Sequence, residues 1–163
     1  MTVETGSPAP DFELVDQHGT PVRLSSFRGQ RDDGGRNVVL VFYPWSFSRV
    51  CTGELSALQD DVSAFVNDDV ALLAVSVDSK FTQRAFAEAR GLTFPVLADF
   101  WPHGEVARRY GVFEENAGAA LRGTFLIDRE GVVRWSVVRG IGEVRDPAAY
   151  KAALAALGVV QDR

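Results

Sequence analysis

The chain has 163 residues, of which 46% are hydrophobic and 24% are charged, and this predicts one globular domain that covers residues 1–163. Its net charge of −5 argues against a nucleic-acid partner, because a phosphate backbone recruits basic surfaces. The sequence has neither an apolar run long enough to span a membrane nor a signal-peptide pattern at its start, so we expect a cytoplasmic protein with no membrane partner.

The first predicted elements form a β-hairpin. Residues 11–15 and 22–24 read as short strands on either side of a tight turn. Residues 30–36 are polar and contain glycine, which indicates a surface loop to which we attach no function. The β-branched and aromatic run at 37–43 shows no alternation, which is typical of a strand buried on both faces. Apolar residues then recur at helical spacing from 51 to 66 and predict a helix.

A second strand–helix pair follows in the middle of the chain. Residues 70–77 predict another buried strand, and residues 82–90 a helix that ends at Gly91. A short strand at 94–97 and a short helix at 105–110 come next.

The last third of the chain predicts a second hairpin and a closing helix. Strands are expected at 123–128 and 132–137, and a helix at 147–157 with its proline in the first turn. The order β-α-β-α, then hairpin and helix, is that of an α/β protein with a thioredoxin-like fold. In that fold a central mixed β-sheet is flanked by helices, here with an additional N-terminal β-hairpin.

The single cysteine, Cys51, is the first candidate for chemistry. It permits no internal disulfide, which fits a reducing compartment. It lies where a buried strand ends, a loop turns and a helix begins. Unpaired N–H groups and the helix dipole in a first helical turn favour an anion, and the thiolate is the reactive form of cysteine. We therefore interpret Cys51 as a nucleophile, although a lone cysteine can also be a small buried apolar residue.

Three residues near Cys51 suit the reduction of a peroxide. The Ser48 hydroxyl can donate a hydrogen bond to a peroxide oxygen, or it can simply cap the helix. Pro44 can shield the pocket without offering an N–H, or it can merely end the strand. Arg122 is placed to reach the site from a neighbouring strand and to hold peroxide oxygens, or it is a surface charge. Arg49, in the loop itself, is not assigned this role, because it can equally face solvent.

The arrangement Pro44-x-x-x-Ser48-x-x-Cys51 resembles the peroxiredoxin motif Pro-x-x-x-Thr/Ser-x-x-Cys, and Arg122 begins a segment similar to the arginine strand of that family. The segments at 6–14 and 22–29 are also peroxiredoxin-like. Within the family, residues 99–104 and 110–113 are most similar to the actinobacterial alkyl hydroperoxide reductase E subgroup. The resemblance covers nearly the whole chain.

The resemblance implies a role for each residue of the motif. Cys51 would be the peroxidatic cysteine, Ser48, Arg122 and the Cys51 N–H would bind the peroxide, and Pro44 would shield it. Glu54 would orient the arginine. The implied activity is a thiol-dependent peroxidase that acts on hydrogen peroxide, organic hydroperoxides and peroxynitrite through a Cys51 sulfenic acid.

The chain departs from one variant of the family pattern. Subgroups with a resolving cysteine on the same helix carry it five residues after the first, and here that position is Ser56. The resemblance therefore implies a one-Cys enzyme that needs an external thiol, either mycothiol with a mycoredoxin or a thioredoxin-like protein. It also implies a homodimer.

Other functions are also compatible with parts of the sequence. A cysteine hydrolase would need His103 as the base for Cys51, and a peroxide sensor would use Cys51 without turnover. One cysteine and two separated histidines predict no metal site, and the absence of a glycine-rich phosphate loop predicts no nucleotide cofactor. Five aromatic residues can either line the entrance of the pocket, favouring organic hydroperoxides, or pack in the core or an interface. They are Tyr43, Trp45, Phe47, Phe100 and Trp101.

Overall fold

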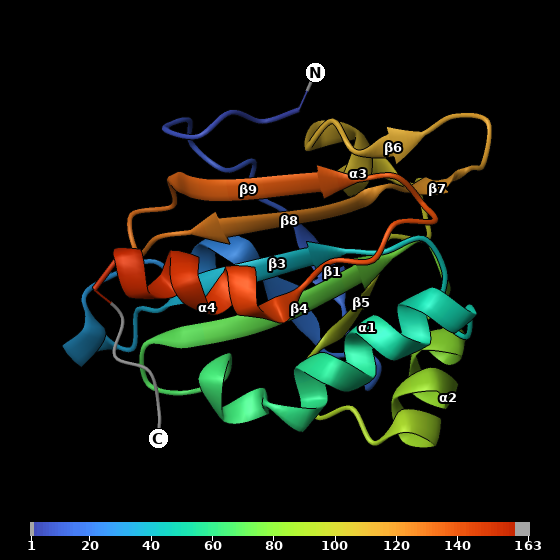
Figure 1. Cartoon of the computed structure of the whole chain (residues 1–163), viewed down its shortest axis with the longest axis horizontal. Helices are drawn as coiled ribbons and strands as arrows, with labels where there is room; N and C mark the ends of the chain where they lie inside the picture. Colours follow the sequence, from blue (N-terminus) through green and yellow to red (C-terminus); the bar gives the residue numbers. More distant parts are fainter. Residues whose placement is uncertain (1, 159–163) are drawn as a thin grey trace.

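The computed structural model describes residues 2–158. Its centre is a five-stranded sheet with the order β5-β4-β3-β8-β9 (Figure 1). The strands are β3 (Asn37–Phe42), β4 (Val70–Ser76), β5 (Val96–Ala98), β8 (Arg122–Ile127) and β9 (Val133–Arg139). Strands β3, β4 and β5 are parallel, and β8 runs antiparallel to both β3 and β9, so the sheet is mixed as predicted.

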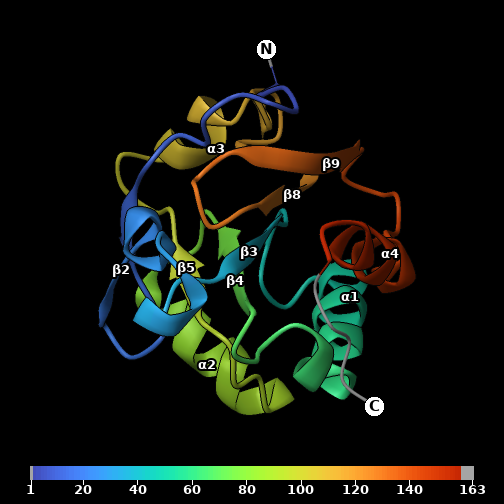
Figure 2. The ribbon, with the colours of Figure 1, turned by 90° about the vertical axis from the view of Figure 1, so that its left-hand side faces the viewer.

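The two faces of the sheet bury separate cores, because successive side chains of a strand point to opposite faces. On one face, Val39 and Val41 of β3 pack with residues of three helices, α1 (Arg49–Asp60), α2 (Lys80–Arg90) and α4 (Pro147–Ala156). On the other face, Val38 and Leu40 pack with α3 (Glu105–Arg109) and with the N-terminal segment. Figure 2 shows α1 and α4 on one side of the sheet and the N-terminal hairpin on the other.

The N-terminal hairpin, β1 (Glu13–Val15) with β2 (Pro21–Arg23), confirms the first prediction. A second hairpin, β6 (Phe113–Glu114) with β7 (Ala119–Ala120), was not predicted, because strands of two residues leave no periodic pattern. A 3₁₀ turn, Arg31–Asp33, lies within the expected loop at 30–36.

Helix α1 differs from its prediction at both ends. It begins at Arg49 and ends at Asp60, whereas the apolar spacing predicted a helix from 51 to 66. The backbone breaks at Asp61 and continues as the 3₁₀ turn Val62–Ala64. The spacing persists beyond the break because Ala64 and Phe65 still pack into the same core.

Helix α2 begins two residues before the predicted start, since the Ser79 side chain caps it by accepting a hydrogen bond from the N–H of Thr82. It ends at Gly91, which adopts a left-handed conformation with φ of 64°, as predicted. Across residues 2–158, we find no helix with the length and apolar character that a membrane span requires.

Candidate active site

The loop from β3 to α1 carries two of the predicted site residues, Pro44 and Ser48, and the first turn of α1 carries Cys51. Strand β3 ends at Phe42, and the buried Pro44 follows it closely. Helix α1 begins at Arg49, so Cys51 is its third residue. The N–H groups of the first helical turn have no acceptor within the helix, and they therefore favour a negative charge beside Cys51.

Cys51 is completely buried. Its side chain is 0% exposed and packs in the core that also holds Tyr43 and Leu55. It is a free thiol, because the sequence contains no second cysteine with which it could pair. Ser56, at the position where a resolving cysteine would stand, is half-buried on the same helix. This burial keeps bulk water from the sulfur.

Ser48 is the residue that precedes α1, but its hydroxyl does not cap the helix. The hydroxyl donates instead to the backbone oxygen of Trp45 at 3.0 Å. The backbone oxygen of Ser48 accepts hydrogen bonds from the Thr52 hydroxyl at 2.7 Å and from the Thr52 N–H at 2.9 Å. The interpretation of the Ser48 side chain as a helix cap is therefore wrong. The half-buried hydroxyl can turn toward another acceptor if it gives up its hydrogen bond to Trp45.

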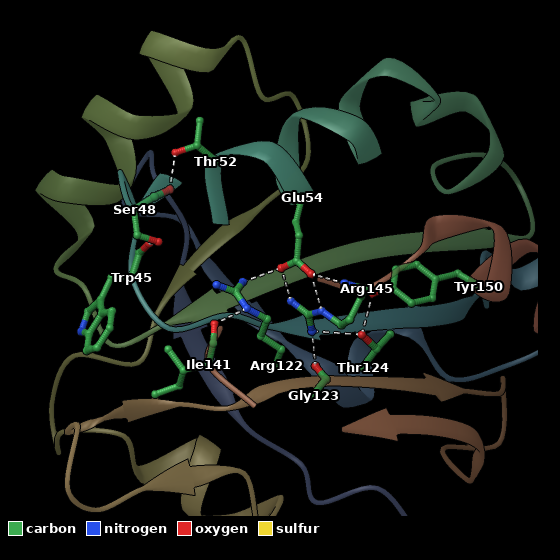
Figure 3. Close-up of polar contacts among 10 residues, drawn as sticks. All are labelled: Trp45, Ser48, Thr52, Glu54, Arg122, Gly123, Thr124, Ile141, Arg145 and Tyr150. Atoms are coloured by element: carbon green, nitrogen blue, oxygen red, sulfur yellow. Dashed lines mark hydrogen bonds and ion pairs between the residues drawn. The ribbon is translucent and has the colours of Figure 1, made fainter. Parts of the chain in front are cut away.

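Glu54 lies one helical turn after Cys51 and holds two arginines (Figure 3). Its Oε1 accepts from Arg122 Nη1 at 2.6 Å and from Arg145 Nη2 at 2.9 Å. Its Oε2 accepts from the backbone N–H of Arg145 at 2.8 Å and from Arg145 Nε at 3.0 Å. All three side chains are buried, with exposures of 2% for each arginine and 5% for Glu54.

The cluster of Glu54, Arg122 and Arg145 has one more positive than negative charge. Burial by itself would raise the pKa of Glu54, but the hydrogen bonds and charge of Arg145, with the charge of Arg122, hold that pKa below its ordinary value. One carboxylate thus faces two guanidinium groups, and the cluster carries a net charge of +1. Because residues three apart share one face of a helix, this charge lies on the same side of α1 as Cys51.

Arg122 is fixed at two of its three nitrogens. In addition to the bond with Glu54, its Nε donates to the backbone oxygen of Ile141 at 2.6 Å. Within the part of the chain that the structure describes, Nη2 has no hydrogen-bond partner. In Figure 3 the guanidinium lies between Glu54 and the loop that carries Ser48. Arg122 is therefore an oriented donor with N–H groups to spare, and it is not the surface charge that the sequence also allowed.

Arg145 was missed by the sequence analysis. Its Nη1 donates to the backbone oxygen of Gly123 and to the Thr124 hydroxyl, both at 3.1 Å, and it thereby joins β8 to the Glu54 carboxylate. No local pattern marks Arg145, because it lies in a polar stretch just before α4 and resembles any solvated arginine.

His103 is not brought to Cys51. Its Nε2 is 2.6 Å from the backbone oxygen of Gly118, and its ring packs edge-on against Phe113. Phe113 packs on the core beneath α3, whereas Cys51 belongs to the core on the opposite face of the sheet. A cysteine hydrolase with His103 as its base therefore has no support in this structure. Arg49 is exposed to solvent.

The aromatic residues considered for the pocket entrance fall into two groups. Tyr43 is 0% exposed and belongs to the core, so it lines no surface. Large exposed areas remain on Trp45, Phe47, Phe100 and Trp101. No group of three or more metal-binding side chains occurs among residues 2–158.

Comparison with known proteins bears directly on this site. A sequence profile of the AhpC/TSA family matches residues 5–136. The chain is 48% identical over 155 residues to alkyl hydroperoxide reductase E of Mycobacterium tuberculosis, in an alignment that covers 95% of this chain and 98% of that protein.

Solved structures agree with this result. Peroxidoxin BcpB from Mycobacterium tuberculosis matches with a TM-score of 0.79 and 33% identity, covering 98% of this chain and 99% of that one. Enterococcus faecalis AhpC matches with a TM-score of 0.84 and 28% identity, covering 97% and 93% of the respective chains. These similarities confirm the predicted fold class, a thioredoxin-like mixed sheet flanked by helices.

Proposed function

The chain belongs to the AhpC/TSA family, and on this basis we propose that Cys51 is the residue with which it reduces hydroperoxides. The relationship to alkyl hydroperoxide reductase E confirms the predicted peroxiredoxin subgroup, and the protein is a thiol-dependent peroxidase. One observation carries the assignment of Cys51. The only cysteine of the sequence lies in the first turn of α1, three positions before the carboxylate that holds Arg122 and Arg145.

In the first half of the cycle the Cys51 thiolate attacks one oxygen of the peroxide bond. An S–O bond forms as the O–O bond breaks, and the sulfur loses two electrons to the peroxide. The departing alkoxide, or hydroxide when the substrate is hydrogen peroxide, takes up a proton and leaves as an alcohol or water. Cys51 is left as a sulfenic acid. Peroxynitrite can be attacked in the same way, with nitrite as the leaving group.

The surrounding residues act on the charge that develops on the departing oxygen. The N–H groups of Arg122 that have no partner among residues 2–158 stabilise that charge together with the N–H of Cys51, because fixed donors in a dry site need no reorganisation. The Ser48 hydroxyl turns from the Trp45 carbonyl to the peroxide. Pro44 is buried and offers no N–H that would compete for the substrate. Glu54 orients Arg122.

The second half of the cycle requires a thiol from another molecule. An external thiolate attacks the sulfenic sulfur, water leaves, and a mixed disulfide forms. A second external thiol then releases Cys51 as a thiol and takes away the disulfide. The chain has no second cysteine to do this, and we assign the role to mycothiol with a mycoredoxin, or to a thioredoxin-like protein.

Three further proposals concern the protein as a whole. We propose a homodimer as the working form and a cytoplasmic location, where a reducing compartment supplies the thiol. We also propose that residues 1–163 act as one domain, since the site combines residues from Pro44 to Arg145 around one sheet.

The exposed aromatic rings of Trp45 and Phe47, which flank the buried Ser46, would favour organic hydroperoxides over hydrogen peroxide.

The direct test is to mix reduced protein with a slight excess of cumene hydroperoxide or hydrogen peroxide and to identify the modified residue by mass spectrometry. We expect rapid, stoichiometric sulfenic acid on Cys51, and none in a Cys51→Ser variant. The fluorescence of Trp45 should change at the same rate. Oxidation no faster than that of a free thiol in solution would falsify the proposal. Repeated turnover when a reductant is supplied distinguishes a peroxidase from a sensor, which would accumulate as oxidised protein.

A further inference from the structure

A closed ring of hydrogen bonds lies under the loop between β3 and α1, and it begins and ends on Ser46. The Ser46 hydroxyl is 2.5 Å from Gln83 Oε1, and Gln83 Nε2 is 2.8 Å from Ser76 Oγ. Ser76 Oγ is 2.5 Å from Asp78 Oδ2, which also accepts the backbone N–H of Ser46 at 2.8 Å. The ring therefore holds Ser46 by both its side chain and its backbone.

The direction of every hydrogen bond in the ring follows from its chemistry. The Asp78 carboxylate only accepts, so the Ser76 hydroxyl must donate to it. The Ser76 oxygen can then accept from the amide of Gln83, and the Gln83 oxygen is left to face the Ser46 hydroxyl. The Tyr43 hydroxyl lies 2.8 Å from Ser46 Oγ and 3.3 Å from Gln83 Oε1, and its one proton can be donated to either oxygen. Three of these bonds run head to tail from Ser46 through Gln83 and Ser76 to Asp78, and bonds aligned in this way reinforce one another in a low-dielectric interior. The N–H of Ser46 closes the ring by donating to the same carboxylate oxygen.

Gln83 is the residue that closes this ring. It belongs to α2, its side chain is 0% exposed, and its second amide N–H donates to the backbone oxygen of Leu97 at 2.9 Å. A glutamine so deeply buried is tolerated only when its polar atoms have partners. Here those partners link one helix to a strand, to the end of the sheet and to the loop.

The loop needs such support because part of its backbone is strained. Phe47, the residue after Ser46, has a φ of 72°, in the left-handed region that a side chain with a Cβ avoids. A residue stays in that region only when its surroundings hold it there. The ring of hydrogen bonds anchors the residue before Phe47. The Phe47 side chain itself packs edge-on against Phe86 of α2, with 5.2 Å between the ring centroids.

We propose that Gln83 and Asp78 are positioning residues of the peroxide-reducing site. By holding Ser46, they keep the segment from Pro44 to Ser48 in the shape that brings the Ser48 hydroxyl and the start of α1 together around the peroxide. This inference rests on the proposed function and extends it to two residues outside the peroxiredoxin motif. It predicts that breaking the ring slows the attack on peroxide and also uncovers the buried sulfur.

The test uses Gln83→Met in the full-length protein, because methionine keeps the length of the side chain and removes its hydrogen bonds. We expect sulfenic acid formation about 100-fold slower than in the wild type, since small displacements in a catalytic site cost that much. We expect alkylation of reduced Cys51 by iodoacetamide to be about tenfold faster, because the loop opens more often. Ser46→Ala removes one hydroxyl of the ring and should shift both rates in the same directions by smaller factors.

Gln17→Met is the matched control. Gln17 is also a buried glutamine whose side chain bridges backbone groups, the oxygen of Phe94 and the N–H of Val96, but it lies outside the ring. The Gln17→Met variant should be less stable than the wild type but should keep the wild-type rates of sulfenic acid formation and of Cys51 alkylation. If Gln83→Met behaves like Gln17→Met, or slows peroxide attack without faster alkylation, the positioning role is overturned. Should Gln83→Met fail to fold, Ser46→Ala decides by the same two rates. A wild-type protein that forms no sulfenic acid would instead refute the proposed function.

Discussion

Glu54 and Arg145 lie 91 positions apart in the sequence and meet in a buried two-point ion pair, with Arg145 Nε on Oε2 at 3.0 Å and Arg145 Nη2 on Oε1 at 2.9 Å. The pair connects the first helix to the segment before the last one. Glu54 Oε1 also accepts a hydrogen bond from Arg122. The position of Arg122 therefore depends on Arg145, because both arginines bind the same carboxylate.

Replacing Arg145 with lysine should disturb the site although the charge remains. A lysine cannot form the planar two-point contact with Glu54, nor reach Gly123 and Thr124 at the same time. We expect a loss of about 2 kcal/mol in the free energy of unfolding and a slower reaction with peroxide. Urea denaturation and stopped-flow oxidation measure the two effects. Arg134→Lys, which alters an exposed pair with Asp128, should change neither, and equal effects at both positions would contradict the prediction.

Glu54→Gln should have the larger effect on stability. Removing the carboxylate leaves two buried guanidinium groups without a counter-charge, which typically costs about 3–5 kcal/mol. The reaction with peroxide should also slow, because a neutral amide oxygen holds Arg122 Nη1 less firmly than the carboxylate oxygen does. Urea denaturation measures the change in the free energy of unfolding, and stopped-flow oxidation measures the rate of the reaction with peroxide. A variant as stable as the wild type would show that the ion cluster does not hold the fold together.

Glu54 should also make the free energy of unfolding fall as the pH is lowered. The pKa of Glu54 lies below its ordinary value of 4.5 in the folded protein. A carboxylate of this kind adds stability that is fully present above 4.5 and is lost as the pH falls through the folded-state pKa. The wild type should therefore lose its advantage over Glu54→Gln as the pH falls from above 4.5 to below the folded-state pKa of Glu54. Urea midpoints across that range test this, and a constant difference would contradict it.

Ser48 should separate catalysis from stability. Its half-buried hydroxyl makes one hydrogen bond, to the Trp45 carbonyl, so Ser48→Ala should cost less than about 1 kcal/mol. If the hydroxyl donates to the peroxide, the same change should slow sulfenic acid formation by about 100-fold. Ser48→Thr keeps the hydroxyl and should restore most of the rate. Stopped-flow oxidation of the three proteins gives the answer, and an unimpaired Ser48→Ala would remove Ser48 from the mechanism.

Much of the fold could be predicted because its signals are local. The buried strands β3 and β4 appear as uninterrupted apolar runs, and Gly91 marks the end of α2 in both the sequence and the structure. The errors occur where local signals are weak. The two-residue strands of β6 and β7 leave no pattern, and apolar spacing alone did not show the break at Asp61.

The order of residues along the chain was enough to predict the part of the site whose members are close in sequence. Pro44, Ser48 and Cys51 span eight positions between a strand and a helix, so their order already implies a shared loop and first helical turn. The identity of Cys51 as the sole thiol, and hence the need for an external one, also follows from the sequence alone.

Which distant residues join Pro44, Ser48 and Cys51 depends on how the chain folds. Arg145 and Gln83 carry no local mark of their roles, because a buried ion pair or amide is defined by the groups that fold against it. His103 illustrates the converse. Its residue type suited a base for Cys51, but the exposed His103 packs against Phe113, whose core lies on the opposite face of the sheet from the core that holds Cys51. A side chain's chemistry can be read from the sequence, whereas its partners depend on how strands and helices pack, and packing connects residues without regard to their separation along the chain.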